Sequence, residues 1–435
     1  MYALAIDLGT TTLAASLIEL DGGSRLAMTG SLNPQRSFGA DVVSRLDAAV
    51  RSADSLKEMS GLIRTELLRL AHELCATTGI TWNQVKQVAI AGNPAMQHIL
   101  LGLPVASLAF PPYRPHYTGG TRLTAFDLGW EGSAGVYVFP MPGGFVGGDT
   151  VAFLYGQLED QVKVEEEVKN QTAPTSVSST STSTFSSTLF LDMGTNGEMA
   201  LMTGDTLWAT SAAAGPAFEG GNLACGMAAL PGAISSVRIK DERVRLQVIG
   251  NAPPAGICGS AAIEAITELL ENHVIEAGGR LRDSAEIASN LANRIIVHQG
   301  ENVFVLHRDA RTLIYLSQGD IRQIQLAKSA IRAGMEVLAQ RSRIQFQAVK
   351  NVILTGSFGA VLHPDWLKSI GIFDESMVHI TRFTPEGALS GAEKALAAGD
   401  DFAAAEAVAG RFRVIPLSGM PLFEELFLRH IDFPH

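Results

Sequence analysis

Two short segments of the sequence place an aspartate at the end of an apolar strand and follow it with glycine and hydroxyl side chains. The first runs from Asp7 to Thr12 (Asp-Leu-Gly-Thr-Thr-Thr), and the second from Asp192 to Gly197 (Asp-Met-Gly-Thr-Asn-Gly). A carboxylate in this position can hold a divalent metal directly or through water, and the glycine lets the backbone approach phosphate oxygens closely. Hydroxyl groups and backbone amides of such turns donate hydrogen bonds to phosphate. The pair of segments therefore predicts two turns that grip a polyphosphate with magnesium between them.

We assign the predicted phosphate and metal site to these two turns. Asp7 and Asp192 are the expected metal ligands and are counted with the catalytic residues. The expected nucleotide-binding residues of the turns are Gly9, Thr10, Thr11, Thr12, Gly194, Thr195, Asn196 and Gly197. One such turn alone would be weak evidence, because many strands followed by tight turns use these residues for geometry. Two copies, in register with a second repeated segment, reverse that balance.

The second repeated segment is a buried strand that ends in glycine. Residues Val85 to Gly92 and Val349 to Gly356 align without a gap, and each follows one of the two turns in the same order. Repetition of separate segments in one order is the mark of a duplicated structural unit. The elements that position the two turns are therefore predicted to be two α/β halves built to one plan.

The length of 435 residues suits two lobes better than one core. We predict an N-terminal lobe over 1–160, a linker over 161–188, a C-terminal lobe over 189–386, and a connecting helix with the C-terminal segment over 387–435. The linker is acidic at first, and its stretch Thr172 to Thr188 has 13 Ser or Thr among 17 residues. Such a composition buries little, so we interpret this stretch as a mobile tether between lobes or the tip of a surface hairpin.

Composition excludes several classes of function. A net charge of −11 argues against a nucleic-acid partner, because binding to a phosphate backbone needs clustered Lys and Arg. No apolar run approaches the roughly 20 residues that cross a bilayer, so no membrane partner is expected. The chain enters a strand at Tyr2 without a basic or apolar export segment, and we therefore expect a cytoplasmic location.

The three cysteines, Cys75, Cys225 and Cys258, lack the close spacing of a zinc or iron–sulfur motif. We therefore expect no iron–sulfur cluster within this chain, and small buried thiols at Cys225 and Cys258. A cluster shared between two subunits is the alternative.

The turns and the repeated strands resemble the acetate and sugar kinase, heat-shock chaperone and actin superfamily. Its five nucleotide motifs all have counterparts here: Asp7 to Thr12, Gly147 to Val151, Asp192 to Gly197, Leu354 to Gly359 and Gly387 to Ala392. The resemblance implies an α/β fold of two duplicated actin/hexokinase-like (ribonuclease H-like) lobes with a nucleotide cleft between them. It also implies that Gly356, Ser357 and Gly359 bind adenosine, and that the small residues of the two connecting helices suit a close crossing.

Asp149 follows two glycines and precedes an apolar helical stretch, so we predict it at a helix N-cap. The superfamily resemblance implies a catalytic role for this carboxylate, as the general base that orients or deprotonates the attacking nucleophile. A purely structural capping role is the alternative.

A narrower resemblance covers nearly the whole chain and points to the reductive activators of corrinoid proteins. The similar segments are Asn33-Pro34-Gln35, Gly39 to Arg45, Gly92 to His98, Ala214 to Gly220, Cys225 to Met227, Gly256 to Ser260 and the ending Phe423 to Pro434. The family implies an ATPase that uses ATP and Mg²⁺ to drive reduction of cob(II)alamin to cob(I)alamin. Its partner is then a corrinoid protein of a methyltransferase system.

Typical members of that family carry an iron–sulfur domain ahead of the ATPase core, whereas this chain begins at the first core strand. Three explanations are open: the electron comes from a separate donor such as a ferredoxin-like protein, an iron–sulfur domain has been trimmed from the sequence, or this member acts differently. The oligomeric state, a homodimer included, stays open.

Other classes of function remain open on the sequence alone. A small-molecule kinase would use the same ATP site, with Asp149 activating a substrate hydroxyl. A 2-hydroxyacyl-CoA dehydratase-type activator would need a cluster between subunits, and a chaperone-like ATPase would remodel a cobalamin enzyme without any redox change.

Three further assignments each have two interpretations. Glu219 would contact nucleotide or metal, or else satisfy the amides of its own turn. His98 and Met96 are interpreted as core residues, with contact to a corrin ring as the alternative. Asp41 and Arg45 are interpreted as a surface helix pair, with phosphate or partner contact as the alternative.

Overall fold

The computed structural model describes residues 1–158, 187–356 and 362–434 of the chain. Contacts between residues divide the chain into two compact units, and each unit is assembled from three separate stretches of sequence. The N-terminal unit comprises Met1–Phe185, Gly204–Ala209 and Glu386–Pro416, and the C-terminal unit comprises Ser186–Thr203, Thr210–Pro385 and Leu417–His435. The stretch predicted to follow the second lobe as a separate segment is thus divided between the two units.

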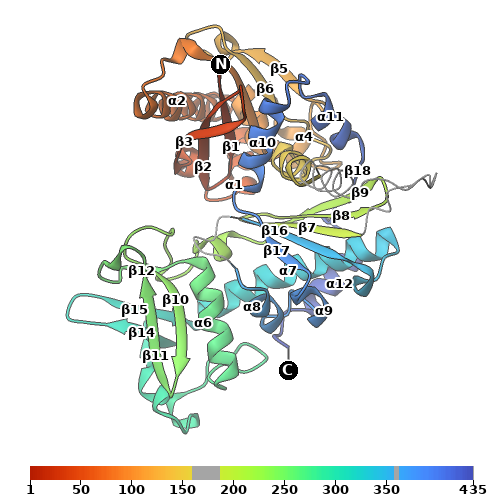
Figure 1. Ribbon diagram of the computed structural model, residues 1–435. Coiled ribbons are helices and arrows are strands. Elements are labelled where there is room, and N and C mark those ends of the chain that lie inside the picture. Colours follow the sequence, from red (N-terminus) through yellow and green to blue (C-terminus); the bar gives the residue numbers. More distant parts are fainter. Residues whose placement is uncertain (159–186, 357–361, 435) are drawn as a thin grey trace, which may run out of the picture. The chain divides into compact units, whose positions relative to one another are not determined.

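A six-stranded sheet organises the N-terminal unit, in the order β3-β2-β1-β4-β6-β5 (Figure 1). β1 is antiparallel to β2 and parallel to β4. β1 and β4 read as nearly continuous apolar runs because both of their faces are covered. The strands are β1 (Tyr2–Leu8), β2 (Thr12–Glu19), β3 (Ser24–Leu32), β4 (Val85–Gly92), β5 (Thr121–Thr124) and β6 (Gly135–Val138).

The helices of the N-terminal unit come from both ends of the chain. α10 packs on β1 and β4, and α2 packs on β2 and β3. A further helix begins at residue 148 and is described as far as residue 158. The labelled helices of this unit are η1 (Pro34–Ser37), α1 (Val42–Arg51), α2 (Ala53–Thr78), η2 (Trp82–Gln84), α3 (Pro94–Leu101), α4 (Ala106–Ala109), η3 (Ala125–Leu128), α10 (Gly387–Ala398) and α11 (Ala403–Gly410).

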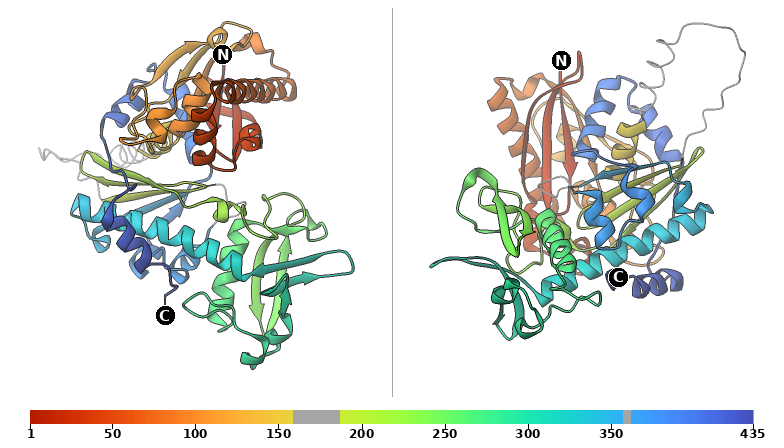
Figure 2. Two further views of the ribbon diagram at one scale, coloured as in Figure 1. Left: turned by 180° about the vertical axis from the view of Figure 1, so that it is seen from behind. Right: turned by 60° about the horizontal axis from the view of Figure 1, so that its bottom comes forward.

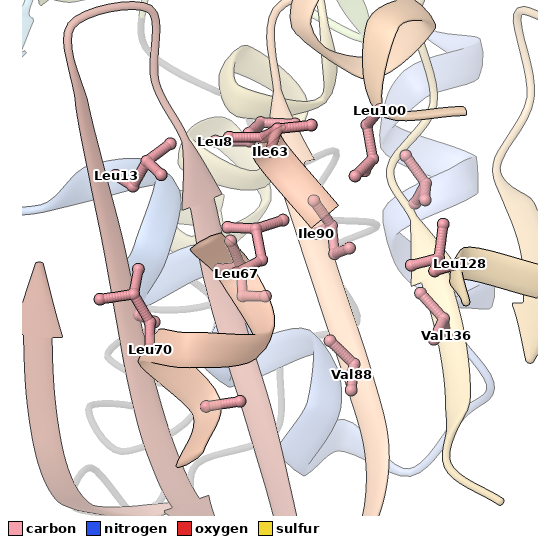
Figure 3. Packing of buried hydrophobic residues seen from close by; sticks show 14 of the residues in the cluster. Leu8, Leu13, Ile63, Leu67, Leu70, Val88, Ile90, Leu100, Leu128 and Val136 are labelled. Atoms are coloured by element: carbon pink, nitrogen blue, oxygen red, sulfur yellow. The ribbon is translucent and has the colours of Figure 1, made fainter. Parts of the chain in front are cut away.

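The core of this unit lies between α2 and the sheet (Figure 3). Ile63, Leu67 and Leu70 are spaced by four and three residues, so they line one face of α2 and pack over buried residues of the strands. Every second residue of β1 from Leu4 to Leu8 belongs to this cluster. Because successive side chains of a strand point to opposite faces, Asp7 points away from the α2 core.

The sheet of the C-terminal unit repeats the plan of the first. Its order is β17-β16-β7-β8-β9-β18, so β9-β8-β7-β16-β17 corresponds to β3-β2-β1-β4-β6. β7 is antiparallel to β8 and parallel to β16, as β1 is to β2 and β4. The predicted duplication is therefore seen in the topology, although Thr188, predicted within the linker, begins β7. The strands are β7 (Thr188–Met193), β8 (Gly197–Thr203), β9 (Thr206–Ala212), β16 (Asn351–Thr355), β17 (Thr381–Phe383) and β18 (Phe412–Val414).

Two smaller sheets extend the C-terminal unit, one of order β11-β10-β12 and one of order β13-β14-β15. The hairpin of β14 and β15 extends away from α7 in both views of Figure 2. The strands are β10 (Ala233–Lys240), β11 (Arg243–Val248), β12 (Gly256–Ile257), β13 (Ile295–His298), β14 (Glu301–Arg308) and β15 (Leu313–Ser317). The helices are η4 (Pro216–Glu219), η5 (Ile249–Asn251), α6 (Gly259–Glu271), η6 (Ser284–Glu286), η7 (Asn290–Arg294), α7 (Gln318–Ser342), η8 (Phe346–Ala348), α8 (Pro364–Ser369), α9 (Glu375–Val378) and α12 (Pro421–Arg429).

The aromatic-rich ending of the chain is fastened to α7. The side-chain amide of Gln325 donates to the carbonyl of Ile431 at 3.0 Å, and the buried ammonium group of Lys328 donates to the carbonyl of Asp432. Burial lowers the pKa of Lys328 to about 8.

Among the described helices, none combines the length and the apolarity needed to cross a bilayer.

Candidate functional site: two phosphate hairpins and their supports

The first hairpin joins β1 to β2 through residues 9–11. Asp7 is half-buried near the end of β1, where it is paired with Ala14 of β2 and Ala91 of β4. Gly9 follows, and a Cβ atom at this position would lie 2.3 Å from the carbonyl oxygen of Thr12. Any side chain would therefore open the turn, which explains why glycine is needed here.

Two asparagines hold this hairpin from behind. The side-chain amide of Asn33 donates to the carbonyl of Gly9 at 2.9 Å, and its backbone N–H donates to the carbonyl of Thr11 at 2.9 Å. The side-chain amide of Asn93 donates to the hydroxyl of Thr10 at 2.9 Å. Asn33 and Asn93 are both buried, so these contacts are shielded from water.

Asp149 lies in the first turn of its helix rather than at the predicted N-cap position. The helix begins at residue 148, and the carbonyl of Gly147 accepts the first helical bond from the N–H of Val151. Gly147 therefore acts as the cap, which leaves the carboxylate of Asp149 to accept from the N–H of Thr150 at 2.7 Å. Burial raises the pKa of Asp149 to about 6, in spite of this hydrogen bond.

Gln97 fixes the start of that helix. Its side-chain amide donates to the carbonyl of Phe139 at 3.0 Å, and its side-chain oxygen accepts from the N–H of Gly148 at 3.4 Å. A Cβ atom at Gly148 would lie 2.5 Å from the Cβ atom of Phe139, and one at Gly147 would lie 2.5 Å from the carbonyl oxygen of Gly92. The two glycines thus let the chain pass close to the end of β4 and bring Asp149 into the first turn.

The two predicted connecting helices approach each other at glycine. A Cβ atom at Gly391 of α10 would lie 1.8 Å from the carbonyl oxygen of Ala152, and one at Gly156 would lie 2.9 Å from the Cα atom of Gly391. The ammonium group of Lys394 donates to the carbonyl of Gly156 at 2.8 Å. The expected close crossing at small residues is therefore present inside the N-terminal unit.

The second hairpin joins β7 to β8 through residues 194–196. Asp192 is half-buried near the end of β7, paired with Glu198 of β8 and Thr355 of β16. Glu219 reaches this turn, because its carboxylate accepts from the N–H of Thr195 at 3.2 Å and from the hydroxyl of Thr195 at 2.7 Å. The structure thus brings Glu219 to the second hairpin, where it satisfies the donors of a turn in the predicted phosphate site.

The segments behind the second hairpin cross each other at glycines. A Cβ atom at Gly259 would lie 1.8 Å from the carbonyl oxygen of Phe218 in η4. The N–H of Met227 donates to the carbonyl of Ile257 at 2.9 Å, and the N–H of Ile257 donates to the carbonyl of Cys225 at 2.8 Å. These sequence segments therefore form one packed support for Glu219.

The predicted adenosine segment is described only in part. Gly356 follows β16 with a φ of 143°, a backbone conformation that favours glycine. Ser357 and Gly359 lie outside the described residues. In the described part of the chain, no group of three or more His, Cys, Asp or Glu side chains forms a metal site. A single carboxylate in each hairpin still fits Mg²⁺, which commonly binds to one or two carboxylates together with phosphates and water.

His98 and Met96 are fully buried, which confirms the core interpretation. Nδ1 of His98 lies 2.7 Å from the carbonyl oxygen of Pro94, and Nε2 accepts from the N–H of His116 at 2.9 Å. The ring is therefore neutral, with its hydrogen on Nδ1. Burial lowers the pKa of His98 in agreement with this arrangement.

The prediction of a surface pair between Asp41 and Arg45 is wrong. Asp41 is the N-cap of α1 and accepts from the N–H of Ser44 at 2.8 Å. Arg45 is fully buried, and its guanidinium donates to the carbonyl of Gly39 at 3.0 Å and lies 3.3 Å from the sulfur of Met96. Burial lowers the pKa of Arg45 to about 10. Asp41 thus caps the helix from outside it, whereas Arg45 lies on the face of α1 that is turned toward the interior.

The cysteines are free thiols. Cys258 is buried, as predicted, and is the N-cap residue of α6, whereas Cys225 is only half-buried. Burial raises the pKa of the Cys225 thiol.

Sequence reasoning gave no individual role to Asn33, Asn93 or Gln97. A signal for two of them was present, since Asn-Pro occurs at both 33–34 and 93–94, each time after a strand and before a helix. Asparagine followed by proline is a strong helix-start signal. What it does not reveal is which group the side-chain amide reaches.

Comparisons with known families match most of the chain. A family model described as the C-terminal domain of RACo, the ASKHA domain, matches residues 186–435, and a model described as the RACo middle region matches residues 2–160. These matches, with the topology above, confirm the predicted α/β fold of two duplicated lobes.

Individual relatives give the same picture. The chain is 29% identical over 447 residues to the corrinoid activation enzyme RamQ of Eubacterium limosum, covering 100% of this chain and 70% of the relative. It is 22% identical over 404 residues to a Methanosarcina barkeri protein named Co(II) methylated amine-specific corrinoid protein reductase, covering 85% of this chain and 65% of the relative. A solved structure of a reductive activator for corrinoid, iron-sulfur protein superposes with a TM-score of 0.86 at 28% identity, covering 100% of this chain and 66% of that one.

Proposed function

Because the chain belongs to the RACo family, we propose that it is a magnesium- and ATP-dependent ATPase that drives reductive activation of a corrinoid protein. The reaction adds one electron to cob(II)alamin and gives cob(I)alamin, in the service of a methyltransferase system. The observation that carries this proposal is the pair of Asp-x-Gly-Thr hairpins on topologically equivalent strands. The chain spans 65% to 70% of the length of the relatives named above, and those relatives are named for corrinoid activation or reduction.

The two hairpins would bind the polyphosphate through the residues predicted from the sequence. Asp7 and Asp192 would hold Mg²⁺ directly or through water, and Mg²⁺ would neutralise charge on the phosphates. Thr10 to Thr12 and Gly194 to Gly197 would supply amide and hydroxyl donors. Gly356, Ser357 and Gly359 would contact the adenosine.

Asp149 is the general base in this proposal. A carboxyl group with a pKa of about 6 is mostly ionised at pH 7, yet it is basic enough to take a proton from an attacking water molecule. Its position is set by Gln97 and by the two preceding glycines. The capping alternative loses support because Gly147 carries out the capping.

Glu219 has a different part in the second hairpin. Its carboxylate occupies the donors of Thr195. Phosphate oxygens would accept hydrogen bonds from the same N–H and hydroxyl groups. We therefore propose that Glu219 keeps this turn ordered before nucleotide binds, and that its hydrogen bonds with Thr195 break on binding.

The electron would come from outside residues 1–435. None of the three cysteines has the spacing of a cluster motif, so we propose a ferredoxin-like donor and no iron–sulfur cluster held by this chain. A cytoplasmic location and the oligomeric state, including a homodimer, stay predictions.

The test is to mix the protein anaerobically with a cob(II)alamin-loaded corrinoid protein, Mg-ATP and a low-potential electron donor. The absorption band of cob(I)alamin is expected to appear only with ATP. Intact ATP hydrolysis without that band, across several donors, would overturn the proposal and leave remodelling of a cobalamin enzyme. Stoichiometric phosphorylation of a small acceptor would instead identify a kinase. A brown protein with a charge-transfer band after anaerobic preparation would identify a dehydratase-type activator.

A further inference from the structure

We infer that Asn33 and Asn93 are paired positioning residues that set the direction of the phosphate-binding groups of the first hairpin. The inference rests on the proposed function, because it concerns the same nucleotide site. It adds residues that lie behind the hairpin and act on phosphate only through the backbone and the hydroxyl group that they hold.

The two asparagines use one arrangement twice. Each is the N-cap of a helix whose first residue is proline, Pro34 for η1 and Pro94 for α3. The side-chain oxygen of Asn33 accepts from the N–H of Gln35 at 2.9 Å, and that of Asn93 accepts from the N–H of Met96 at 3.0 Å. Because the atom that accepts a backbone N–H must be oxygen, the other atom of each side-chain amide must be the NH₂ group. Both NH₂ groups therefore have to donate toward the hairpin.

Asn33 fixes the orientation of two peptide groups. Its side chain holds the carbonyl of Gly9, and its own N–H holds the carbonyl of Thr11. In a trans peptide the C=O and the N–H of the same unit point in opposite directions. The N–H groups of Thr10 and Thr12 are therefore directed away from Asn33. These amides belong to the residues predicted to bind phosphate.

Asn93 fixes the polarity of a hydroxyl group. Its NH₂ group donates to the oxygen of Thr10, which is buried in the turn. A hydroxyl has one hydrogen to donate, so an oxygen that receives a hydrogen bond from Asn93 keeps its own hydrogen for another acceptor. Thr10 is thereby set to act as a donor, which is the role that an anionic phosphate requires.

Prearranged donors matter because they need no reorganisation when the charged ligand arrives. Two asparagines that also cap helices achieve this with side chains whose rotation is already restricted. The helix caps and the hairpin are thus coupled, and movement of η1 or α3 would shift the hairpin groups that the asparagines hold.

Serine variants separate positioning from capping. Ser is about as good an N-cap as Asn, but its hydroxyl is too short to hold the helix N–H and also reach the hairpin. We expect Asn33→Ser and Asn93→Ser each to raise the Kd for Mg-ATP by about tenfold, the effect of one charge-assisted hydrogen bond. The Kd for adenosine, which carries no phosphate, should stay unchanged. Asn272→Ser is the matched control, because Asn272 also donates to a backbone carbonyl, that of Glu268 at 2.8 Å, at the end of α6.

A double-mutant cycle tests the hydroxyl argument directly. Thr10→Val removes the hydroxyl while leaving both asparagines in place, and it should weaken Mg-ATP binding about as much as Asn93→Ser. Adding Asn93→Ser to Thr10→Val should then change the Kd for Mg-ATP by less than about twofold. If a serine variant alone fails to fold, Thr10→Val still tests the hydroxyl argument.

The outcomes distinguish this inference from the proposed function. Wild-type affinity for Mg-ATP in the serine variants would overturn the inference and leave the ATPase proposal standing. An equal loss of Mg-ATP and adenosine affinity would show a general structural defect and would also overturn it. If the wild-type protein itself binds no Mg-ATP, both fall.

Discussion

Replacing Asp149 by Asn should make the protein more stable and far less active. Asn has nearly the same shape and can still accept the hydrogen bond from Thr150 N–H, so only the charge changes. The folded protein raises the pKa of Asp149 from 3.8 to about 6, with burial as the main cause. At about 1.36 kcal/mol for each pKa unit, holding the ionised carboxylate in the folded state costs up to about 3 kcal/mol at pH 7. The free energy of unfolding of the Asp149→Asn variant should therefore exceed that of the wild type by up to that amount.

The sign of the pH dependence follows from the direction of this pKa change. A carboxyl group whose pKa is raised on folding binds more protons in the folded state, so its penalty grows as pH rises from about 4 to about 6. The stability gained by Asp149→Asn should therefore be about half as large at pH 5 as at pH 7. We would measure it as the difference between variant and wild type in urea unfolding at both values of pH.

Activity should change in the opposite direction. Loss of a general base typically lowers the rate constant by about 10² to 10⁴, while binding of ATP need not change. Asp54 provides a matched control, since it is exposed at the second position of α2. Asp54→Asn should lower the free energy of unfolding by about 0.5 kcal/mol, because a charge is lost at the helix N-terminus, and should leave ATP hydrolysis intact. If Asp149→Asn destabilises the protein at pH 7, or hydrolyses ATP at the wild-type rate, the reasoning is wrong.

Three other changes test the site and its supports. Gly391→Ala should destabilise the protein by about 2 kcal/mol or more in thermal unfolding, because the new Cβ would lie 1.8 Å from the carbonyl oxygen of Ala152. Gly61→Ala, in open space on α2, should instead stabilise it by up to about 1 kcal/mol. Asp192→Ala should abolish ATP turnover and weaken ATP binding without unfolding the protein, and full turnover would refute the assignment of the second hairpin. His98, whose pKa burial lowers, should cause stability to fall as pH drops below about 6.5. Gln offers one donor and one acceptor, as the neutral ring does, but does not titrate, so His98→Gln should reduce that dependence of stability on pH. An unchanged pH profile would contradict this prediction.

The two hairpins were predictable because their signals are local. An apolar run, an aspartate, a glycine and hydroxyl residues follow one another directly, and the repeated strands β4 and β16 confirm the same plan by their sequence. Strand position in the sheet then follows from the duplication.

The supports of the hairpins were not predictable in the same way. Asn33 and Gly9 are separated by 24 positions, and Asn93 and Thr10 by 83, so no local pattern joins them. Arg45 illustrates the converse error, because a charged residue at helical spacing from an acidic one is usually exposed. Its burial depends on groups from other segments, which the fold brings around it. The start of the Asp149 helix was misplaced by two positions, since glycine also serves as an N-cap.

The interleaved construction of the two units bears on how the protein is made. α10 covers β1 and β4, yet it is encoded by residues 387–398, near the end of the chain. During synthesis, α10 can therefore cover the face formed by Ala3 and Ala5 only after residue 387 and those after it have left the ribosome. A chain that stops shortly before Gly387 would leave that face uncovered. In nascent chains, we therefore expect the N-terminal unit to become protected only late in synthesis. We also expect late truncations to disturb the N-terminal unit, although the missing residues belong to the other end of the sequence.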